Sequence, residues 1–224
     1  LSQSLNLGVT FITDKMGHET FTRYMKAFGF GEKTGIDLPN EVTGDITPLG
    51  DGEKPDVNYA AASYGQGISV SPIAMTRALA VLANGGVLPS PHVVTGVKYG
   101  NGVTRSIEPE SGPQVIKPET AEVVSSMLTT VYDKALLGGK YKMEHYSIAA
   151  KTGTAQIAVP GQGYYTDRYL HSFFGYFPAQ EPKYIIFLFT VEPHGAEFAS
   201  ATLAQPFVDM ARFLINYYNI PPDR

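Results

Sequence analysis

The order of helical and strand patterns constrains the fold of this 224-residue chain more than any other feature. Helical periodicity of apolar residues dominates the first half and returns near the C-terminus, whereas three strand patterns follow one another in between. Helices followed by clustered strands are typical of an α+β layer architecture, and we therefore predict an α+β fold. The predicted helices are 3–29, interrupted at Gly17-His18, 73–83, one opened by Pro118 and closed by Gly138-Gly139, and 201–218; the predicted strands are 147–156, 172–177 and 183–191.

The domain organisation follows from the same patterns. The chain carries no internal repeat and no linker long enough to separate two domains. We therefore expect one domain over residues 1–224, with a mainly helical part over 1–145 and the strands and last helix over 146–224. Between the first two helices, the turn residues of the stretch 31–60 predict irregular structure.

Capping signals define the ends of the second helix. Ser71 is a good N-cap, and Pro72 fits the first helical position, where its missing N–H costs nothing. Asn84-Gly85-Gly86 should end the helix by supplying a left-handed residue. For the last helix, periodicity predicts a buried face formed by Leu203, Phe207, Met210, Leu214 and Ile215.

Turn signals suggest how the strands connect. Val93–Val97 and Thr104–Ile107 should pair as a small hairpin, and the turn-rich stretch 178–182 should join the last two strands as an antiparallel hairpin. We expect the stretch Gly161–Tyr169 to form a loop. The aromatic residues of the strands should belong to the sheet core: Phe173, Phe174, Tyr176, Phe177, Phe187 and Phe189.

Composition excludes several classes of function. There are 17 Lys and Arg against 21 Asp and Glu, a net charge of −4 without a basic run, so we expect no nucleic-acid partner. The chain has no cysteine, and its five histidines show no metal-ligand spacing, so we expect no metal and no cofactor. The longest apolar run, Tyr184–Phe189, is far shorter than the ~20 residues of a membrane helix.

The motif Lys151-Thr152-Gly153-Thr154 is the strongest candidate for chemistry. It lies in a predicted strand, where Thr152 and Thr154 share one face because side chains alternate. Gly153 removes a side chain where another molecule could approach the backbone. An ammonium and two hydroxyls at a strand edge can bind a carboxylate and pair with an extended peptide. A triplet of this kind is common, however, and does not define a function alone.

Ser4-Leu5-Asn6 gives this motif a partner. Ser-x-Asn at the start of a helix, followed much later by a strand-borne Lys-Thr-Gly, resembles the serine acyl-transferring enzymes that recognise penicillin. Segments over nearly the whole chain resemble the transpeptidase domain of penicillin-binding proteins, in particular the class B enzymes of bacterial cell-wall synthesis. These segments are Phe28-Gly29-Phe30-Gly31, Thr34-Gly35-Ile36-Asp37-Leu38-Pro39, Tyr64-Gly65-Gln66-Gly67, Ser71-Pro72, Asn84-Gly85-Gly86, Lys151-Thr152-Gly153-Thr154-Ala155-Gln156 and Phe174-Gly175-Tyr176-Phe177-Pro178.

The resemblance has one departure. The acylated serine of the family lies in a Ser-x-x-Lys motif upstream of Ser-x-Asn, and no serine of this sequence has a lysine three positions on. The expectation is therefore a C-terminal part of the domain, with the nucleophile and two further sheet strands supplied by an upstream segment or a companion chain. Alone, this part should be inactive. The implied fold is an antiparallel sheet with a helical subdomain that carries Ser4-Leu5-Asn6.

The resemblance also implies roles and partners. The substrates would be peptidoglycan stem peptides ending in D-Ala-D-Ala, which β-lactams imitate, on the extracytoplasmic side of a bacterial membrane. Ser4 would relay a proton to the leaving amine and Asn6 would hold a substrate amide. Lys151 would supply positive potential, and the hydroxyls of Thr152 and Thr154 would bind the substrate carboxylate. The Thr154 N–H would be one oxyanion donor.

Other interpretations stay open at this point. Ser4 could be only a helix N-cap. The chain could be a non-catalytic β-lactam sensor or a partner-binding module that keeps the penicillin-recognising residues. It could also belong to a serine β-lactamase, which shares the fold.

Overall fold

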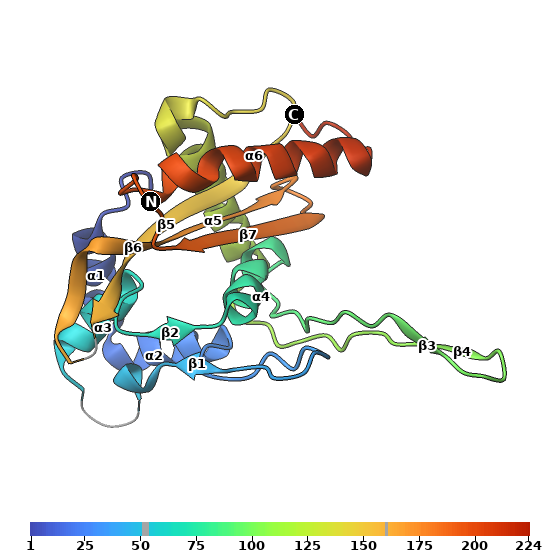
Figure 1. The fold of residues 1–224 in the computed structure, drawn as a ribbon, viewed down its shortest axis with the longest axis horizontal. Coiled ribbons are helices and arrows are strands. Elements are labelled where there is room, and N and C mark those ends of the chain that lie inside the picture. Colours follow the sequence, from blue (N-terminus) through green and yellow to red (C-terminus); the bar gives the residue numbers. More distant parts are fainter. Residues whose placement is uncertain (51–53, 160) are drawn as a thin grey trace. The chain divides into compact units, whose positions relative to one another are not determined.

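The computed structural model describes residues 1–50, 54–159 and 161–224, and these residues form two compact units. The first unit contains Leu1–Gly8 and Glu122–Arg224, and the second contains Val9–Ala121. Figure 1 shows an α+β fold, as predicted, with the three long strands in the first unit. A single domain over 1–224 with a division at residue 145 stays a prediction.

A three-stranded antiparallel sheet forms the centre of the first unit. Its strands are β5 (Ala149–Val159), β6 (Gly163–Phe177) and β7 (Tyr184–Val191), in the order β5-β6-β7. The three predicted strands are therefore confirmed, together with the antiparallel hairpin through residues 178–182.

The predicted loop over Gly161–Tyr169 is wrong for most of its length. Strand β6 begins at Gly163, and its first residues pair with the end of β5, as in the register Ala158↔Tyr164. The strand continues into this polar stretch because its first residues pair with β5. Burial of one face is not what makes the stretch a strand.

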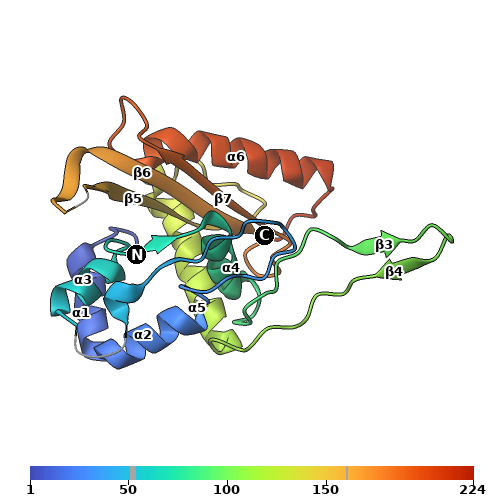
Figure 2. The same cartoon turned by 60° about the horizontal axis from the view of Figure 1, so that its bottom comes forward.

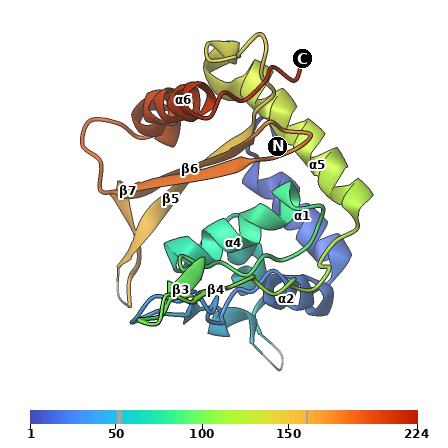
Figure 3. The same cartoon turned by 90° about the vertical axis from the view of Figure 1, so that its right-hand side faces the viewer.

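Helices cover both faces of the sheet. Helix α6 (Ala199–Tyr217) lies along one face, as Figure 3 shows, and Phe207 stacks on Phe173 of β6 with 4.4 Å between ring centroids. On the other face, Ser125 of α5 (Pro118–Thr130) hydrogen-bonds the Tyr176 hydroxyl at 2.6 Å. The core between α6 and the sheet includes Tyr132, Ile148, Ala150, Phe173, Phe177, Ile186, Leu203, Phe207, Val208, Ala211 and Ile215.

Two residues expected in this core are not there. Met210 of α6 is 43% exposed and Phe189 of β7 is 48% exposed. Met210 lies at the margin of the apolar stripe of α6, and Phe189 lies on the edge strand β7, so each loses one side of the packing that a central position would supply. Leu203, Phe207 and Ile215 are buried as predicted.

The second unit contains most of α1, the helices η1 and α2 to α4, and two small sheets. Helix α1 starts in the first unit and ends before Gly17, whose φ of 83° breaks the helical stretch as predicted. Ser71 caps α4, since its Oγ accepts the Ala74 N–H at 3.3 Å. The stretch expected to be irregular up to residue 60 already contains the first half of α3. The elements are α1 (Asn6–Met16), α2 (His18–Ala27), β1 (Gly44–Asp45), η1 (Thr47–Leu49), α3 (Asp56–Ser63), β2 (Ser69–Val70), α4 (Pro72–Ala83), β3 (Gly96–Lys98) and β4 (Thr104–Ser106).

The predicted hairpin of β3 and β4 is confirmed and extends away from the rest of its unit (Figure 2). All residues of both strands are exposed. The Asp37 carboxylate accepts the backbone N–H groups of Val93 and Val94, at 2.7 and 2.8 Å, and so fixes the base of the hairpin. These two hydrogen bonds, that from Val94 first, hold the pKa of Asp37 below its usual range.

A second carboxylate fixes the turn just before Asp37. Glu41 accepts hydrogen bonds from the Thr34 hydroxyl, the Thr34 N–H and the Gly35 N–H. The segment Thr34–Pro39 therefore has a structural role in this unit. Among the helices of the described residues, none is long and apolar enough to cross a membrane.

Candidate active site

Strand β5 carries the predicted binding motif at an edge of the sheet. Within the described part of the chain, β5 pairs with β6 alone, so its outer side is open. Thr152 lies opposite Phe173 and Thr154 lies opposite His171. Since directly opposed residues of antiparallel strands share a face, both threonines lie on the face that α6 covers. Lys151 and Gly153 lie on the other face.

A pocket of about 190 Å³ brings together three of the predicted site residues, Ser4, Lys151 and Thr152. Its other walls come from the turns that follow α5, including Tyr132, and from Ser200 near the start of α6. All of these residues belong to the first compact unit. The amino end of the chain and the edge strand therefore face a common pocket although they are almost 150 positions apart in the sequence.

The other predicted residues do not line this pocket. Asn6 is the first residue of α1 and is exposed. Gly153 lies between the two threonines, and a Cβ at this position would be 2.6 Å from the Ser172 hydroxyl oxygen of β6. A side chain at this position would therefore displace the Ser172 hydroxyl of the neighbouring strand, a contact that the sequence pattern could not reveal.

Ser4 lies in a turn with an uncommon backbone conformation. Its φ is 49°, and its N–H donates to the Leu1 carbonyl at 3.0 Å. Helix α1 begins at Asn6, two residues later, so the structure does not show Ser4 as its N-cap. Left-handed backbone at a residue other than glycine is concentrated at functional sites.

Lys151 is a partly buried cation. Its Nζ donates to the Thr152 carbonyl at 2.6 Å, and burial lowers the pKa of the ammonium below its ordinary value of 10.5. Among the described residues, no carboxylate lies within ion-pair distance of Lys151. An ammonium held in this way gains most from an anionic ligand, which would offset the cost of its burial.

The hydroxyl oxygen of Thr154 already accepts one hydrogen bond from the protein. Its Oγ1 accepts the Ala199 N–H, at the start of α6, at 3.1 Å. The hydroxyl hydrogen is left to donate, and the side chain is exposed. Thr154 is thus a hydrogen-bond donor whose oxygen is held by the protein and whose proton can point to a ligand.

Sequence reasoning missed three residues around the site. Tyr132 lies in a π-helical turn (Val131–Ala135), lines the pocket and is fully buried. Its hydroxyl has no hydrogen-bond partner among the described residues, and burial raises its pKa. Ser200 lines the pocket from α6, and His171 is buried beside Thr154 on the neighbouring strand β6. A π-turn leaves no periodic signal in the sequence, although such turns are frequent at functional sites.

An open edge strand with a Lys-Thr-Gly motif, facing a serine turn across one pocket, defines the class of penicillin-recognising serine acyltransferase domains. Residues 1–211 match the family described as the penicillin binding protein transpeptidase domain. The chain therefore belongs to this family, as its motifs predicted.

Relatives agree with this assignment. Stage V sporulation protein D of Bacillus subtilis is 33% identical over 212 residues, which cover 93% of this chain and 32% of that protein. Penicillin-binding protein PbpB of Mycolicibacterium smegmatis is 31% identical, over 98% of this chain and 35% of that protein. The chain thus spans about a third of the length of these curated relatives.

Solved structures agree on the fold. The apo crystal structure of penicillin binding protein 3 from Mycobacterium tuberculosis superimposes with a TM-score of 0.87 and 30% identity, over 99% of this chain and 51% of that chain. The same protein was also solved in complex with aztreonam and with ampicillin. A peptidoglycan synthetase from Bifidobacterium adolescentis, at 24% identity and a TM-score of 0.83, shares the fold.

Proposed function

We propose that residues 1–224 form the substrate-binding part of a peptidoglycan D,D-transpeptidase, which cross-links stem peptides through an acyl-serine intermediate. The observation that carries this proposal is the pocket shared by Ser4, Lys151 and Thr152 beside the open edge of β5. An extended peptide ending in D-Ala-D-Ala can add to this edge as a strand, with its carboxylate near the ammonium. β-Lactams, which bind a protein of similar fold, would take the same place.

The residues divide the work in this proposal. Ser4 relays a proton to the leaving amine, and Asn6 holds an amide of the substrate. Lys151 supplies positive potential, which is strong because the ammonium is partly buried and has no carboxylate partner in the described part of the chain. Thr152 and Thr154 bind the substrate carboxylate, and the Thr154 N–H is one oxyanion donor.

The serine that attacks the substrate and becomes acylated is none of Ser4, Asn6, Lys151, Thr152 and Thr154. No serine of the sequence has a lysine three positions on, so the nucleophile comes from a segment outside residues 1–224 or from a companion chain. The whole protein would act on the extracytoplasmic side of a bacterial cell membrane, where its peptidoglycan substrate lies. The same absence of Ser-x-x-Lys is also what a non-catalytic β-lactam sensor or a partner-binding module would show.

A fluorescent penicillin and a stem peptide test the proposal. We expect no covalent label on residues 1–224, because the covalent pathway requires the nucleophile. We also expect a peptide ending in D-Ala-D-Ala to bind reversibly, and Lys151→Met to weaken this binding by about tenfold or more, since hydrogen bonds to charged groups contribute about 1.5–3 kcal/mol. The matched control is Lys98→Met, a lysine of the exposed hairpin.

Two results would contradict the proposal. Covalent labelling of any serine in residues 1–224 would show that the nucleophile is present after all. Binding of the peptide with the same affinity to the wild type and to Lys151→Met would show that the ligand does not use this pocket. Turnover of a stem peptide in the presence of an added upstream segment with Ser-x-x-Lys would separate the transpeptidase from the sensor, because acylation by penicillin alone is expected of both.

A further inference from the structure

His171 of β6 is a buried polar residue that the proposed roles do not use. Its side chain is 0% exposed, and both ring nitrogens have partners. Nε2 lies 3.0 Å from the Glu197 carbonyl oxygen, and Nδ1 lies 2.9 Å from the Thr202 hydroxyl. Since a carbonyl only accepts, Nε2 carries a hydrogen and donates it. A buried histidine with two such contacts is fixed in both position and orientation.

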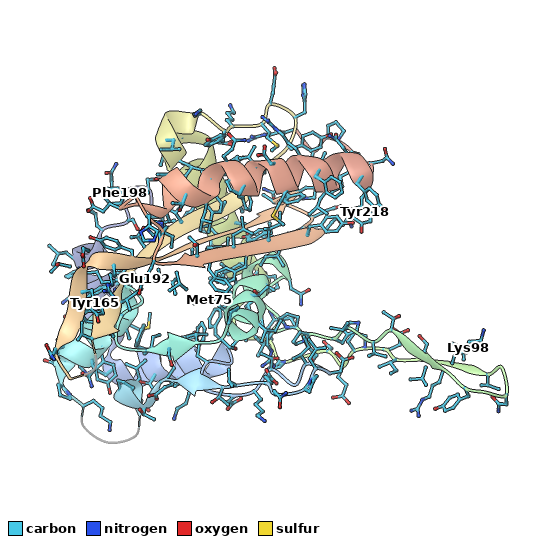
Figure 4. All side chains as sticks on the ribbon, viewed as in Figure 1. Met75, Lys98, Tyr165, Glu192, Phe198 and Tyr218 are labelled. Carbon is cyan, nitrogen blue, oxygen red and sulfur yellow. The ribbon has the colours of Figure 1, made fainter. Side chains whose placement is uncertain are left out.

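Both partners of His171 belong to one short segment, Glu197–Thr202, which leads into α6 and forms its first turn. In this segment the side chain of Phe198 is 60% exposed (Figure 4), and Ala199, which is 1% exposed, contributes only a small apolar burial. The polar contacts of His171 lie on either side of Ala199 in the sequence. They tie the segment to the sheet at the point where it meets β5.

The same segment holds Thr154. Ala199 donates its N–H to the Thr154 Oγ1 at 3.1 Å, and Thr154 lies directly opposite His171 in the β5–β6 register. His171, the segment 197–202 and Thr154 therefore form a short chain of contacts on one face of the sheet. All its members belong to the first compact unit.

We propose that His171 is a positioning residue for carboxylate recognition, which acts by holding Ala199 against Thr154. With one lone pair of Oγ1 occupied by the Ala199 N–H, the Thr154 hydroxyl hydrogen donates outward, to the carboxylate of a peptide at the edge of β5. Without His171, the segment moves, Thr154 gains an alternative acceptor or rotamer, and the donor is no longer held toward the ligand. This inference rests on the proposed function and extends it to a residue that touches no substrate.

Amide hydrogen exchange tests the link without any ligand. In the wild type, the Ala199 amide should be protected, and in His171→Phe it should exchange about tenfold faster, as expected for the loss of buried hydrogen bonds. His171→Gln, whose amide can reach the Glu197 carbonyl, should restore part of the protection. Tyr169→Phe is the matched control, because it removes a hydrogen bond from the same strand, to Thr166, and leaves the segment 197–202 untouched.

A pair of peptides tests the consequence for binding. A peptide ending in D-Ala-D-Ala as the free acid should bind the wild type more tightly than its C-terminal amide, by about tenfold or more. His171→Phe should bring the ratio of the affinities for acid and amide toward one. Adding Thr154→Val should change this ratio little further, because both substitutions remove the same contact, that of the Thr154 hydroxyl with the carboxylate. A purely structural role would weaken acid and amide equally. If His171→Phe does not fold, Thr202→Val should show the same loss of preference. This variant removes the Nδ1 partner and also the hydrogen bond from the Thr202 hydroxyl to the Ala199 carbonyl at 3.2 Å, so His171→Gln, which leaves that second bond in place, is measured beside it.

The outcomes separate the two proposals. Unchanged exchange at Ala199 in His171→Phe, or in Thr202→Val where the first variant does not fold, would overturn the positioning role. So would an unchanged acid-to-amide ratio. If the wild type itself shows no preference for the acid, the proposed function fails, while faster exchange at Ala199 in His171→Phe would still establish the link to the segment.

Discussion

Two of the antiparallel hairpins in the described part of the chain, β5–β6 and β3–β4, are stabilised in different ways. The hairpin β5–β6 belongs to the sheet, and its inner half packs on α6 through Phe173 and Phe207. The hairpin β3–β4 has every strand residue exposed and is fixed at its base by the Asp37 carboxylate. An isolated two-stranded hairpin is marginally stable in water. The first ribbon, hairpin β5–β6, is thus stabilised by an apolar core. The second ribbon, hairpin β3–β4, is held by what we call the Asp37 clasp, the two hydrogen bonds from the Val93 and Val94 N–H groups to the Asp37 carboxylate.

The proposed site lies on the ribbon that has a core. Lys151–Thr154 lie in the part of β5 opposite His171–Phe174, next to the buried core that contains Phe173. Binding groups need to be held within fractions of an ångström, which packed elements achieve better than exposed ones. We therefore expect the same strand pairing to hold binding groups in place where one face is buried, as in β5–β6, better than where both faces are exposed, as in β3–β4.

Removing the core of the first ribbon should have the largest effect. Phe207→Ala deletes a fully buried ring that stacks on Phe173 and contacts Tyr132 edge-on. We expect a loss of about 3–5 kcal/mol in the free energy of unfolding, the usual cost of such a truncation. Urea unfolding measures it. Tyr99→Ala, on the exposed hairpin, should change stability by no more than about 0.5 kcal/mol. Equal losses at the two positions would contradict the comparison.

A pair of Gly→Ala variants tests the same difference between the two hairpins. A Cβ at Gly175 of β6 would lie 2.4 Å from the Phe207 ring and 2.9 Å from the Ala150 Cβ, whereas at Gly100 of the exposed hairpin it would meet nothing within 4 Å. Gly175→Ala should therefore destabilise the protein by about 1–3 kcal/mol, as overpacking does. Gly100→Ala should stay within about 0.5 kcal/mol of the wild type. The melting temperatures of both variants check this, and a tolerated Gly175→Ala would mean that the core is looser than the contacts indicate.

Much of the fold was predictable because local signals and burial agree in it. Ser71 and Pro72 start α4 where their capping chemistry requires, and the alternating apolar strands of the first unit appear in order. The start of β6 was not predictable, since Gly163–Tyr169 is mostly exposed and pairs with β5 at its two ends, through Gly163, Tyr164 and Tyr169, around an irregularity in the register. Periodicity reports burial, so it does not detect a strand whose two faces are both exposed.

The candidate site was predictable only in part, for a related reason. Ser4, Lys151 and Thr152 were found because motifs record the residue types that the chemistry needs. His171 and Tyr132 are held by buried contacts between elements far apart in the sequence, and no spacing rule records such contacts. The Asp37 clasp was hidden as well, because its partners are backbone N–H groups, which carry no sequence signal.

Releasing the clasp of the second ribbon should have a smaller and local effect. Asp37→Asn removes the charge that binds the Val93 and Val94 N–H groups, so both amides should exchange faster while global stability changes little. The pH dependence has a defined sign. Because the folded pKa of Asp37 is lowered, its contribution is complete above the ordinary value of 3.8 and is lost as the pH falls through the folded pKa.

Exchange rates at pH 5 and below pH 3.8 measure this effect. In the wild type, protection at Val93 and Val94 should hold at the higher pH and decline at the lower, after correction for intrinsic exchange. In Asp37→Asn it should be low at both. Protection that does not depend on pH would show that the base of the hairpin is held by something other than the carboxylate.

The smallest effect concerns the two lysines of the ribbons, Lys151 on β5 and Lys98 on β3. Burial lowers the folded pKa of Lys151, so the charged ammonium costs stability at neutral pH, and this cost shrinks as the pH rises from the folded pKa toward 10.5. Lys151→Met should therefore be slightly more stable than the wild type at pH 7, and the difference should decrease at alkaline pH. Lys98→Met, on the exposed ribbon, should change stability by less than about 0.5 kcal/mol at either pH. Urea unfolding at both pH values compares the stabilities of the two variants.

The two outcomes for Lys151→Met have different meanings. If Lys151→Met is more stable than the wild type and no longer binds the D-Ala-D-Ala peptide, the edge strand keeps a destabilising charge for its ligand. If Lys151→Met is less stable than the wild type, the ammonium has a structural role in the free protein.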